Sequence, residues 1–172
     1  MDILVISLRI VHILSGVFWL GVSFFNVVFL QPAVRATGGE GQKVMQHLML
    51  RTRLTSAVYA AATLNLLSGL LLYGILFRFS ARALTSPYAI TLGVGGLAGV
   101  IAWAIALLVV RGVFDRMKGL GQAIQAQGGA PAPAQAAELQ ALGGRLVNLG
   151  QWAVAFLIVA LLAMSVAQYV RF

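Results

Sequence analysis

The stretch that decides the fold is IVHILSGVFWLGVSFFNVVFLQPAV, residues 10–34, which contains no charged side chain. A helix rises about 1.5 Å per residue and needs roughly 20 apolar residues to cross a bilayer. Three more charge-free stretches follow, and the four are 25, 24, 28 and 25 residues long: 10–34, 54–77, 83–110 and 146–170. The sequence therefore predicts four transmembrane helices.

Composition agrees with a membrane protein. The chain has 172 residues, 60% of them apolar before its 19 glycines are counted. Glycine raises that share to about 71%, against roughly 45–50% in soluble domains. A fifth charge-free interval, 119–137, is rich in Gln, Gly and Pro and predicts a loop. The absence of cysteine excludes disulfides and thiolate metal sites.

We expect an all-α fold, an antiparallel bundle of four transmembrane helices that forms a single domain over residues 1–172. Pro32 and the glycine run at 38–41 are expected to end the first helix, and an interfacial turn then leads into the second. Helix-compatible segments around 128–133 predict a cytoplasmic helical hairpin between the third and fourth helices. The expected spans are about 5–31, 54–77, 87–110 and 146–170, with cytoplasmic loops at 32–53 and 111–145.

Basic residues predict the orientation, because cytoplasmic loops are enriched in Lys and Arg. Eight lie in the loop between the first and second helices and in the loop between the third and fourth helices: Arg35, Lys43, Arg51, Arg53, Arg111, Arg116, Lys118 and Arg145. Four lie on the other side: Arg9, Arg78, Arg82 and Arg171. We expect both termini outside, which in a bacterium places a multi-pass protein in the plasma (inner) membrane. The basic residues that give the chain its net charge of +8 flank the spans, and this placement favours lipid headgroups over nucleic acid as a partner.

One face of the first helix is polar. Its members recur at spacings of three and four residues: Arg9, His12, Gly16, Trp19, Ser23 and Asn26. Hydrocarbon penalises exposed polar groups, so this face should meet the other helices. Close packing explains Gly16, Ser23 and Asn26, whereas for His12 a structural role and a role as a cofactor or metal ligand both stay open.

The depth of each side chain in the membrane limits which residues could bind the same metal as His12. His47 lies about 33 Å or more away along the helix axis, so the two histidines should not share one metal. Met164 on the fourth helix differs from His12 in depth by only about 6 Å, and it is a candidate second ligand as well as a candidate core residue. Arg9 is an interface anchor or, with haem bound, a partner for a propionate.

Space for a cofactor is expected beside the third helix, where Gly95 and Gly99 also form the close-packing pattern of membrane helices. Tyr59 on the second helix could line a polar cavity or belong to an interfacial belt. All four acidic residues lie outside the spans, which disfavours a carboxylate-driven pump. Any catalysis would be that of a membrane oxidoreductase, because no nucleophile, base and orienting acid converge as a hydrolase requires.

The run HILSGVFWLGVSFFNVVFLQP, residues 12–32, resembles the start of the copper-resistance D (CopD)-like membrane proteins and of HemJ-type protoporphyrinogen oxidases. In these families a histidine precedes a Trp-x-Gly element by seven residues, as His12 precedes Trp19 and Gly21 here. The segment KVMQHLMLRTRL, residues 43–54, is also similar to HemJ-type proteins. The resemblance implies a helical bundle whose first-helix histidine, His12, binds haem b or copper.

Two functional hypotheses remain from the sequence. The first is haem b or copper binding near the outer face, for electron transfer or for metal or haem handling. The second is a cofactor-free accessory or assembly subunit, which would form a homo-oligomer or join a larger membrane complex. A small-solute carrier is disfavoured by the missing intramembrane acids.

Overall fold

The computed structural model describes residues 3–78, 80, 85–128 and 130–170. Arg82 and Arg171, two of the predicted outer charges, lie outside the described residues. The described residues form helices without strands, and four helices are long and apolar enough to cross a membrane: Ile3–Ala36, Leu54–Phe77, Pro87–Ala126 and Pro133–Tyr169. The predicted all-α, multi-pass membrane protein is confirmed.

The first helix continues through Pro32, so the expected break at this proline is wrong. It consists of α1 (Ile3–Phe25), the π-helical turn η1 (Asn26–Leu30) and α2 (Gln31–Ala36). In η1 the N–H of Gln31 donates to the carbonyl of Asn26, five residues back. A proline ring lacks an N–H and collides with the carbonyl four residues earlier, and a wider turn relieves both problems. The chain turns only at Gly38, where φ is +59°.

The segment after this turn is a full helix, α3 (Gly38–Arg51), rather than the single interfacial turn expected. It leads into α4 (Leu54–Phe77) through Thr52, whose backbone is extended. The Thr52 hydroxyl donates to the carbonyl of Leu48 and accepts from the N–H of Leu54, so it satisfies groups at the ends of both helices.

The second half of the chain forms two long helices. One contains α6 (Pro87–Ala104), the π-helical segment η2 (Ile105–Val110) and α7 (Arg111–Ala126), and the other contains α8 (Pro133–Val166) and the 3₁₀ turn η3 (Ala167–Tyr169). Ser86 caps α6 by accepting from the N–H of Ala89 at 3.2 Å. Arg116 and Glu138 form an ion pair at 2.7 Å across α7 and α8. The helical hairpin is confirmed, and its arms directly continue the two apolar helices.

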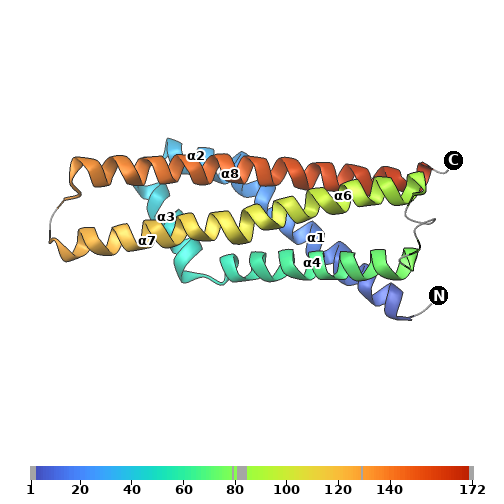
Figure 1. Ribbon diagram of the computed structural model, residues 1–172. Helices are drawn as coiled ribbons and strands as arrows, with labels where there is room; N and C mark the ends of the chain where they lie inside the picture. The colour runs from blue at the N-terminus through green and yellow to red at the C-terminus, as the bar shows by residue number, and fades with distance from the viewer. Residues whose placement is uncertain (1–2, 79, 81–84, 129, 171–172) are drawn as a thin grey trace.

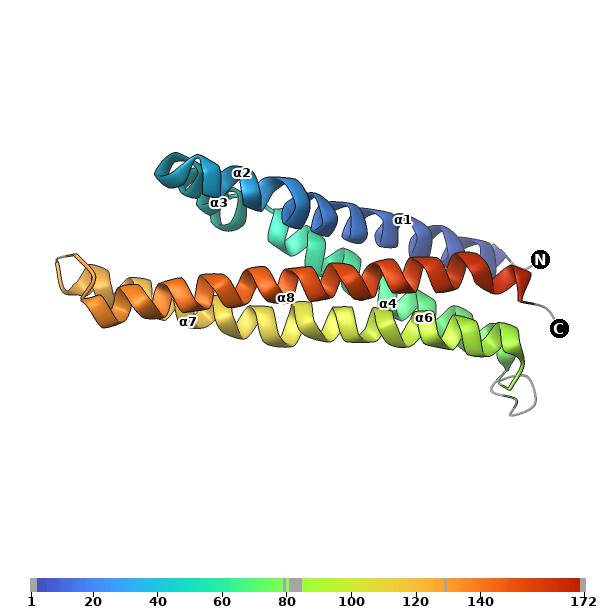
Figure 2. The ribbon, with the colours of Figure 1, turned by 90° about the horizontal axis from the view of Figure 1, so that it is seen from above.

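The helices pack mainly as two antiparallel pairs, α1 with α4 and α6 with α8. Figures 1 and 2 show that the start of α1 and the end of α8 lie at the same end of the bundle. The opposite end holds α2, α3 and the α7–α8 hairpin (Figure 2). The two ends of the bundle therefore correspond to the two groups of basic residues in the sequence.

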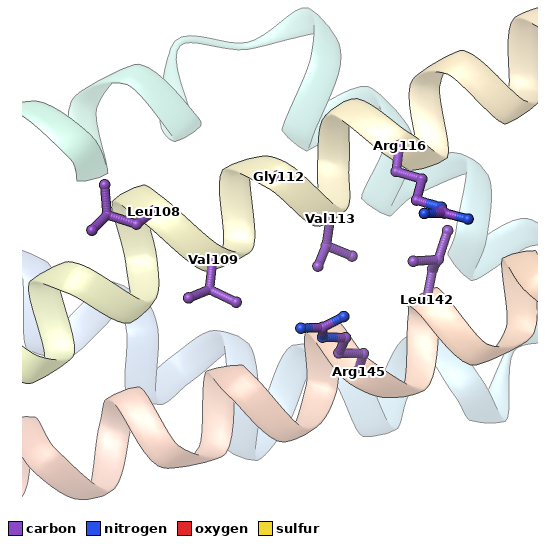
Figure 3. Close-up of a pocket in the computed structure, with 7 residues that line it drawn as sticks. All are labelled: Leu108, Val109, Gly112, Val113, Arg116, Leu142 and Arg145. Atoms are coloured by element: carbon purple, nitrogen blue, oxygen red, sulfur yellow. The ribbon is translucent and has the colours of Figure 1, made fainter.

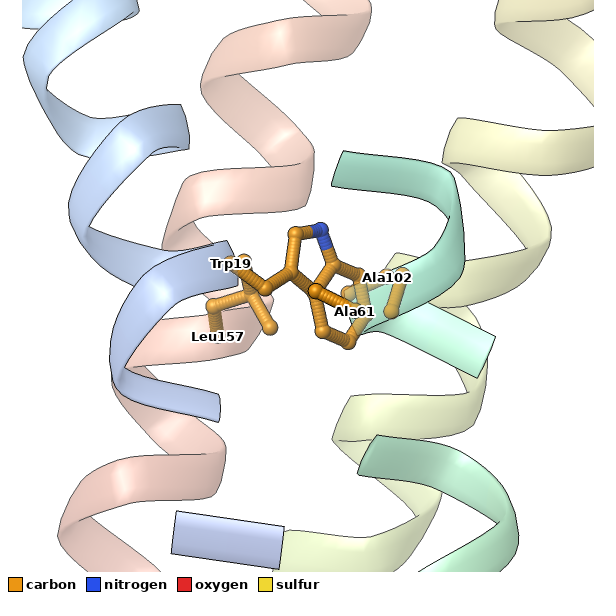
Figure 4. Close-up of a cluster of buried hydrophobic side chains, with 5 residues drawn as sticks. Trp19, Ala61, Ala102 and Leu157 are labelled. Atoms are coloured by element: carbon orange, nitrogen blue, oxygen red, sulfur yellow. The ribbon is translucent and has the colours of Figure 1, made fainter. Parts of the chain in front are cut away.

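The core lies where all four long helices meet. The indole of Trp19 is 2% exposed and packs among small and branched side chains from the other three helices (Figure 4): Ala61, Ala62, Ala102 and Leu157. Large apolar side chains elsewhere remain uncovered, and Val17 and Leu108 are 67% and 68% exposed. Such exposure suits side chains whose surroundings are lipid tails rather than water.

Gly95 sets the spacing of the α6–α8 pair. A Cβ at this position would lie 3.2 Å from the carbonyl oxygen of Ala160 and 3.2 Å from the Cβ of Ala163. At Gly99, one turn along the same helix, nothing lies within 4 Å of the corresponding point. The two glycines of the predicted packing pattern therefore differ in how closely the neighbouring helix approaches.

We predict that Gly95→Leu lowers the thermal unfolding temperature in detergent by about 5 °C, because overpacking costs about 1–3 kcal/mol and each kcal/mol corresponds to about 2–4 °C. Gly99→Leu is the matched control, since it makes the same change on the same helix and should leave the temperature nearly unaltered. Equal losses in the two variants would contradict this account of the α6–α8 contact.

Candidate functional site

His12 lies on α1 and faces α4, the helix against which α1 packs most closely. Its ring rests on the backbone of Gly69: a Cβ on Gly69 would lie 2.8 Å from His12 Cε1 and 3.1 Å from Nδ1. Any other residue at position 69 would occupy the place of the imidazole. The glycine is therefore what allows the ring to enter the interface between the two helices.

Hydrogen bonds around His12 favour a proton on Nδ1. This nitrogen lies 2.9 Å from the backbone carbonyl oxygen of Asn65, which can only accept, and that contact is shorter than the 3.3 Å to the side-chain Nδ2 of Asn65, which can only donate. The Ser68 hydroxyl lies 3.3 Å from the same nitrogen and donates its own proton to the carbonyl of Leu64. Among the described residues no hydrogen bond reaches Nε2, which keeps its lone pair.

Asn65 and Gly16 repeat the same arrangement in reverse. The side-chain Nδ2 of Asn65 donates to the backbone carbonyl of His12 at 2.7 Å, and a Cβ on Gly16 would lie 2.7 Å from that nitrogen. Each helix thus supplies one polar side chain and, four residues later, one glycine that makes room for the partner's side chain. We call His12, Gly16, Asn65 and Gly69 the reciprocal cluster.

The reciprocal cluster is only partly sealed from its surroundings. Both His12 and Asn65 are half-buried, whereas Ser68 is 3% exposed. Ser15, on the same helix as His12, is buried as well and donates to the carbonyl of Val11 at 2.6 Å. The imidazole is therefore held on its Nδ1 side by buried groups of α4 while the residue as a whole keeps some exposure.

The other predicted ligands lie elsewhere on the bundle. Arg9 is exposed, one turn from His12 toward the start of α1. Met164 belongs to the α6–α8 pair, where its Cγ lies 3.1 Å from the Cβ position of Gly95. His12 and Met164 thus pack in different helix pairs. His47 is exposed on α3, in the part of the chain that lies at the other end of the bundle.

The remaining predicted residues are distributed along the polar face of α1 and on α4. Trp19 is in the core, and Ser23 is half-buried. The Oδ1 of Asn26 is buried without a hydrogen-bond partner among the described residues. Tyr59 is half-buried on α4, within electrostatic reach of Arg111 and Asp115. Among the described residues, no hydrogen bond joins any of these side chains to the reciprocal cluster.

The sequence did not predict that Asn65 and Ser68 are the partners of His12. One signal was present: Asn65 and Gly69 have the same spacing as His12 and Gly16. The glycine of such a pattern lets a neighbouring helix approach closely, but the pattern does not give the register that pairs the two helices. Few side chains that bind metals lie close together, since the described residues contain no group of three or more His, Cys, Asp or Glu side chains that could hold a metal ion.

Comparison with family models, with curated proteins and with solved structures finds no match for this chain. The fold and the residues of the cluster therefore carry the functional argument, and the CopD- and HemJ-like resemblance stays a prediction.

We predict that the neutral imidazole of His12 carries its proton on Nδ1 rather than on Nε2, because a carbonyl acceptor stabilises that tautomer. Nitrogen NMR of ¹⁵N-histidine in the His47→Gln variant observes this one imidazole alone. A proton on Nε2 with none on Nδ1 would contradict the assigned hydrogen bond.

Proposed function

We propose that this integral membrane protein binds haem b, or alternatively copper, through Nε2 of His12 and serves in electron transfer or in metal or haem handling. The observation that carries the proposal is the hydrogen bond from Nδ1 to the carbonyl of Asn65. Histidines that bind metals almost always donate their other ring N–H to a carbonyl or carboxylate, which orients the ring and raises its basicity.

The donor chemistry favours haem over a bare copper ion. A copper site built from the protein needs several ligands, and the chain has two histidines and no cysteine. A porphyrin brings four nitrogen ligands, so the protein needs to supply only one or two axial groups. When bound, the haem iron would supply one-electron redox chemistry, and His12 would hold it from the α1–α4 interface.

Two further residues have roles in this proposal. Arg9, exposed one turn from His12, would pair with a haem propionate. Met164 would serve as a second axial ligand only if α8 presents its sulfur toward the iron; otherwise that position is held by water, left open, or filled by a second subunit. By the charge pattern, the cluster lies in the outer half of a bacterial plasma membrane with both termini outside.

A second candidate is the accessory or assembly subunit without a cofactor. It is favoured by Gly96 and Gly99 on α6, where nothing lies within 4 Å of either Cβ position. Small residues with open space allow another helix to approach closely. This hypothesis expects a colourless, metal-free protein purified as an oligomer or with partners.

We predict that protein purified from haem-replete cells shows a Soret band that changes on reduction with dithionite, and that His12→Ala removes it. Gly69→Ala should also weaken the band, because the new methyl group displaces the ring without removing any ligand. Gly21→Ala is the matched control, since nothing lies within 4 Å of its Cβ position.

Three outcomes would contradict the haem proposal: no Soret band, a band that persists in His12→Ala, or equal effects of Gly69→Ala and Gly21→Ala. Metal analysis of the same samples distinguishes copper, which His12→Ala would likewise remove. A protein that holds neither haem nor copper and migrates as an oligomer would favour the accessory-subunit hypothesis.

A further inference from the structure

A surface cavity of about 300 Å³, open to the outside, lies at the base of the helical hairpin, far along the chain from the reciprocal cluster. Figure 3 shows its walls on η2, α7 and α8. The lining includes apolar side chains, one glycine and two arginines: Leu108, Gly112, Val113, Leu142, Arg116 and Arg145. Both guanidinium groups lie in the gap between the two helices (Figure 3).

The two arginines differ in their electrostatic state. Arg116 forms an ion pair with Glu138, with 2.7 Å between Nε and Oε1. Arg145 is exposed, and it forms no hydrogen bond or ion pair with any residue that the structure describes. The cavity wall therefore has one positive charge that the described part of the chain does not balance, which suits a ligand with a single negative charge.

The cavity lies where the helices leave the apolar part of the chain. Leu108 belongs to the third charge-free stretch, whose last residue is 110, and Arg145 directly precedes the fourth stretch, which begins at 146. One end of the cavity is thus at the level of hydrocarbon and the other at the level of charged headgroups. Phospholipids present acyl chains and phosphate in the same order, and basic pockets between transmembrane helices bind anionic headgroups.

We propose that this cavity binds the phosphodiester of an anionic phospholipid, with Arg145 as the anion ligand and the acyl chains beside Leu108. An arginine can donate two parallel hydrogen bonds to phosphate oxygens, which makes the contact directional as well as electrostatic. Arg116, already paired with Glu138, fixes the opposite wall. The apolar side of the cavity distinguishes a lipid from a soluble phosphate, which would leave that side uncovered.

Binding of fluorescent phosphatidylglycerol to the full-length protein in uncharged detergent micelles tests the proposal. Arg145→Gln should weaken binding about tenfold, because hydrogen bonds to a charged group are among the strong ones. Gly112→Leu should weaken it comparably while every charge is retained, since Gly112 lines the cavity and has nothing within 4 Å of its Cβ position, so that a leucine would take up space there. Leucine also favours a helix, so the fold should persist.

Arg35→Gln is the matched control: it removes one exposed positive charge from α2, at the same end of the bundle, and should change binding by less than about twofold. Equal losses in Arg35→Gln and Arg145→Gln would overturn the proposal in favour of diffuse surface charge. Unchanged binding in Gly112→Leu would overturn it as well. Competition by soluble glycerol phosphate as strong as by the lipid would show that the ligand is a free phosphate and not a phospholipid.

Discussion

Hydrocarbon offers no water to an imidazole or an amide, so the imidazole of His12 and the amide of Asn65 need partners on the helix that each one faces. The reciprocal cluster meets this constraint: His12 lies over Gly69, and Asn65 lies over Gly16. Each glycine permits the close approach that the other helix's side chain needs. The register fixed in this way also places Trp19 beside Ala62, where the core of the bundle forms. The rest of the structure depends on this contact because it sets how α1 and α4 align.

The same contact gives the histidine its chemistry. A carbonyl acceptor at Nδ1 directs the lone pair to Nε2, and the ring cannot turn without losing that hydrogen bond. An oriented imidazole with one free nitrogen is suited to bind a metal, and the scarcity of other donors favours haem, which brings most of its own ligands. The structural and ligand roles of His12 are thus compatible, since they use different nitrogens.

The sequence predicted the fold well because the bilayer makes length and charge decisive. Four charge-free stretches identify the long helices, and the expected third span begins at residue 87, where α6 begins. The predicted break at Pro32 is wrong because a π-helical turn accommodates the proline, and no residue pattern in the sequence predicts that turn. The polar face of α1 was visible in its helical spacing. Its partners Asn65 and Ser68 were not, because matching faces on two helices requires their relative register, which single-helix periodicity does not contain.

Nitrogen coupling between His12 and the proposed metal tests the central claim most directly. Pulsed electron paramagnetic resonance on oxidised His47→Gln protein, prepared with ¹⁴N- or ¹⁵N-histidine, detects the single remaining imidazole if it binds the metal. The account predicts a histidine coupling that changes with the isotope and that includes a remote protonated nitrogen, the Nδ1 bonded to Asn65. A protein-bound paramagnetic metal whose spectrum is unaffected by the histidine isotope would contradict it.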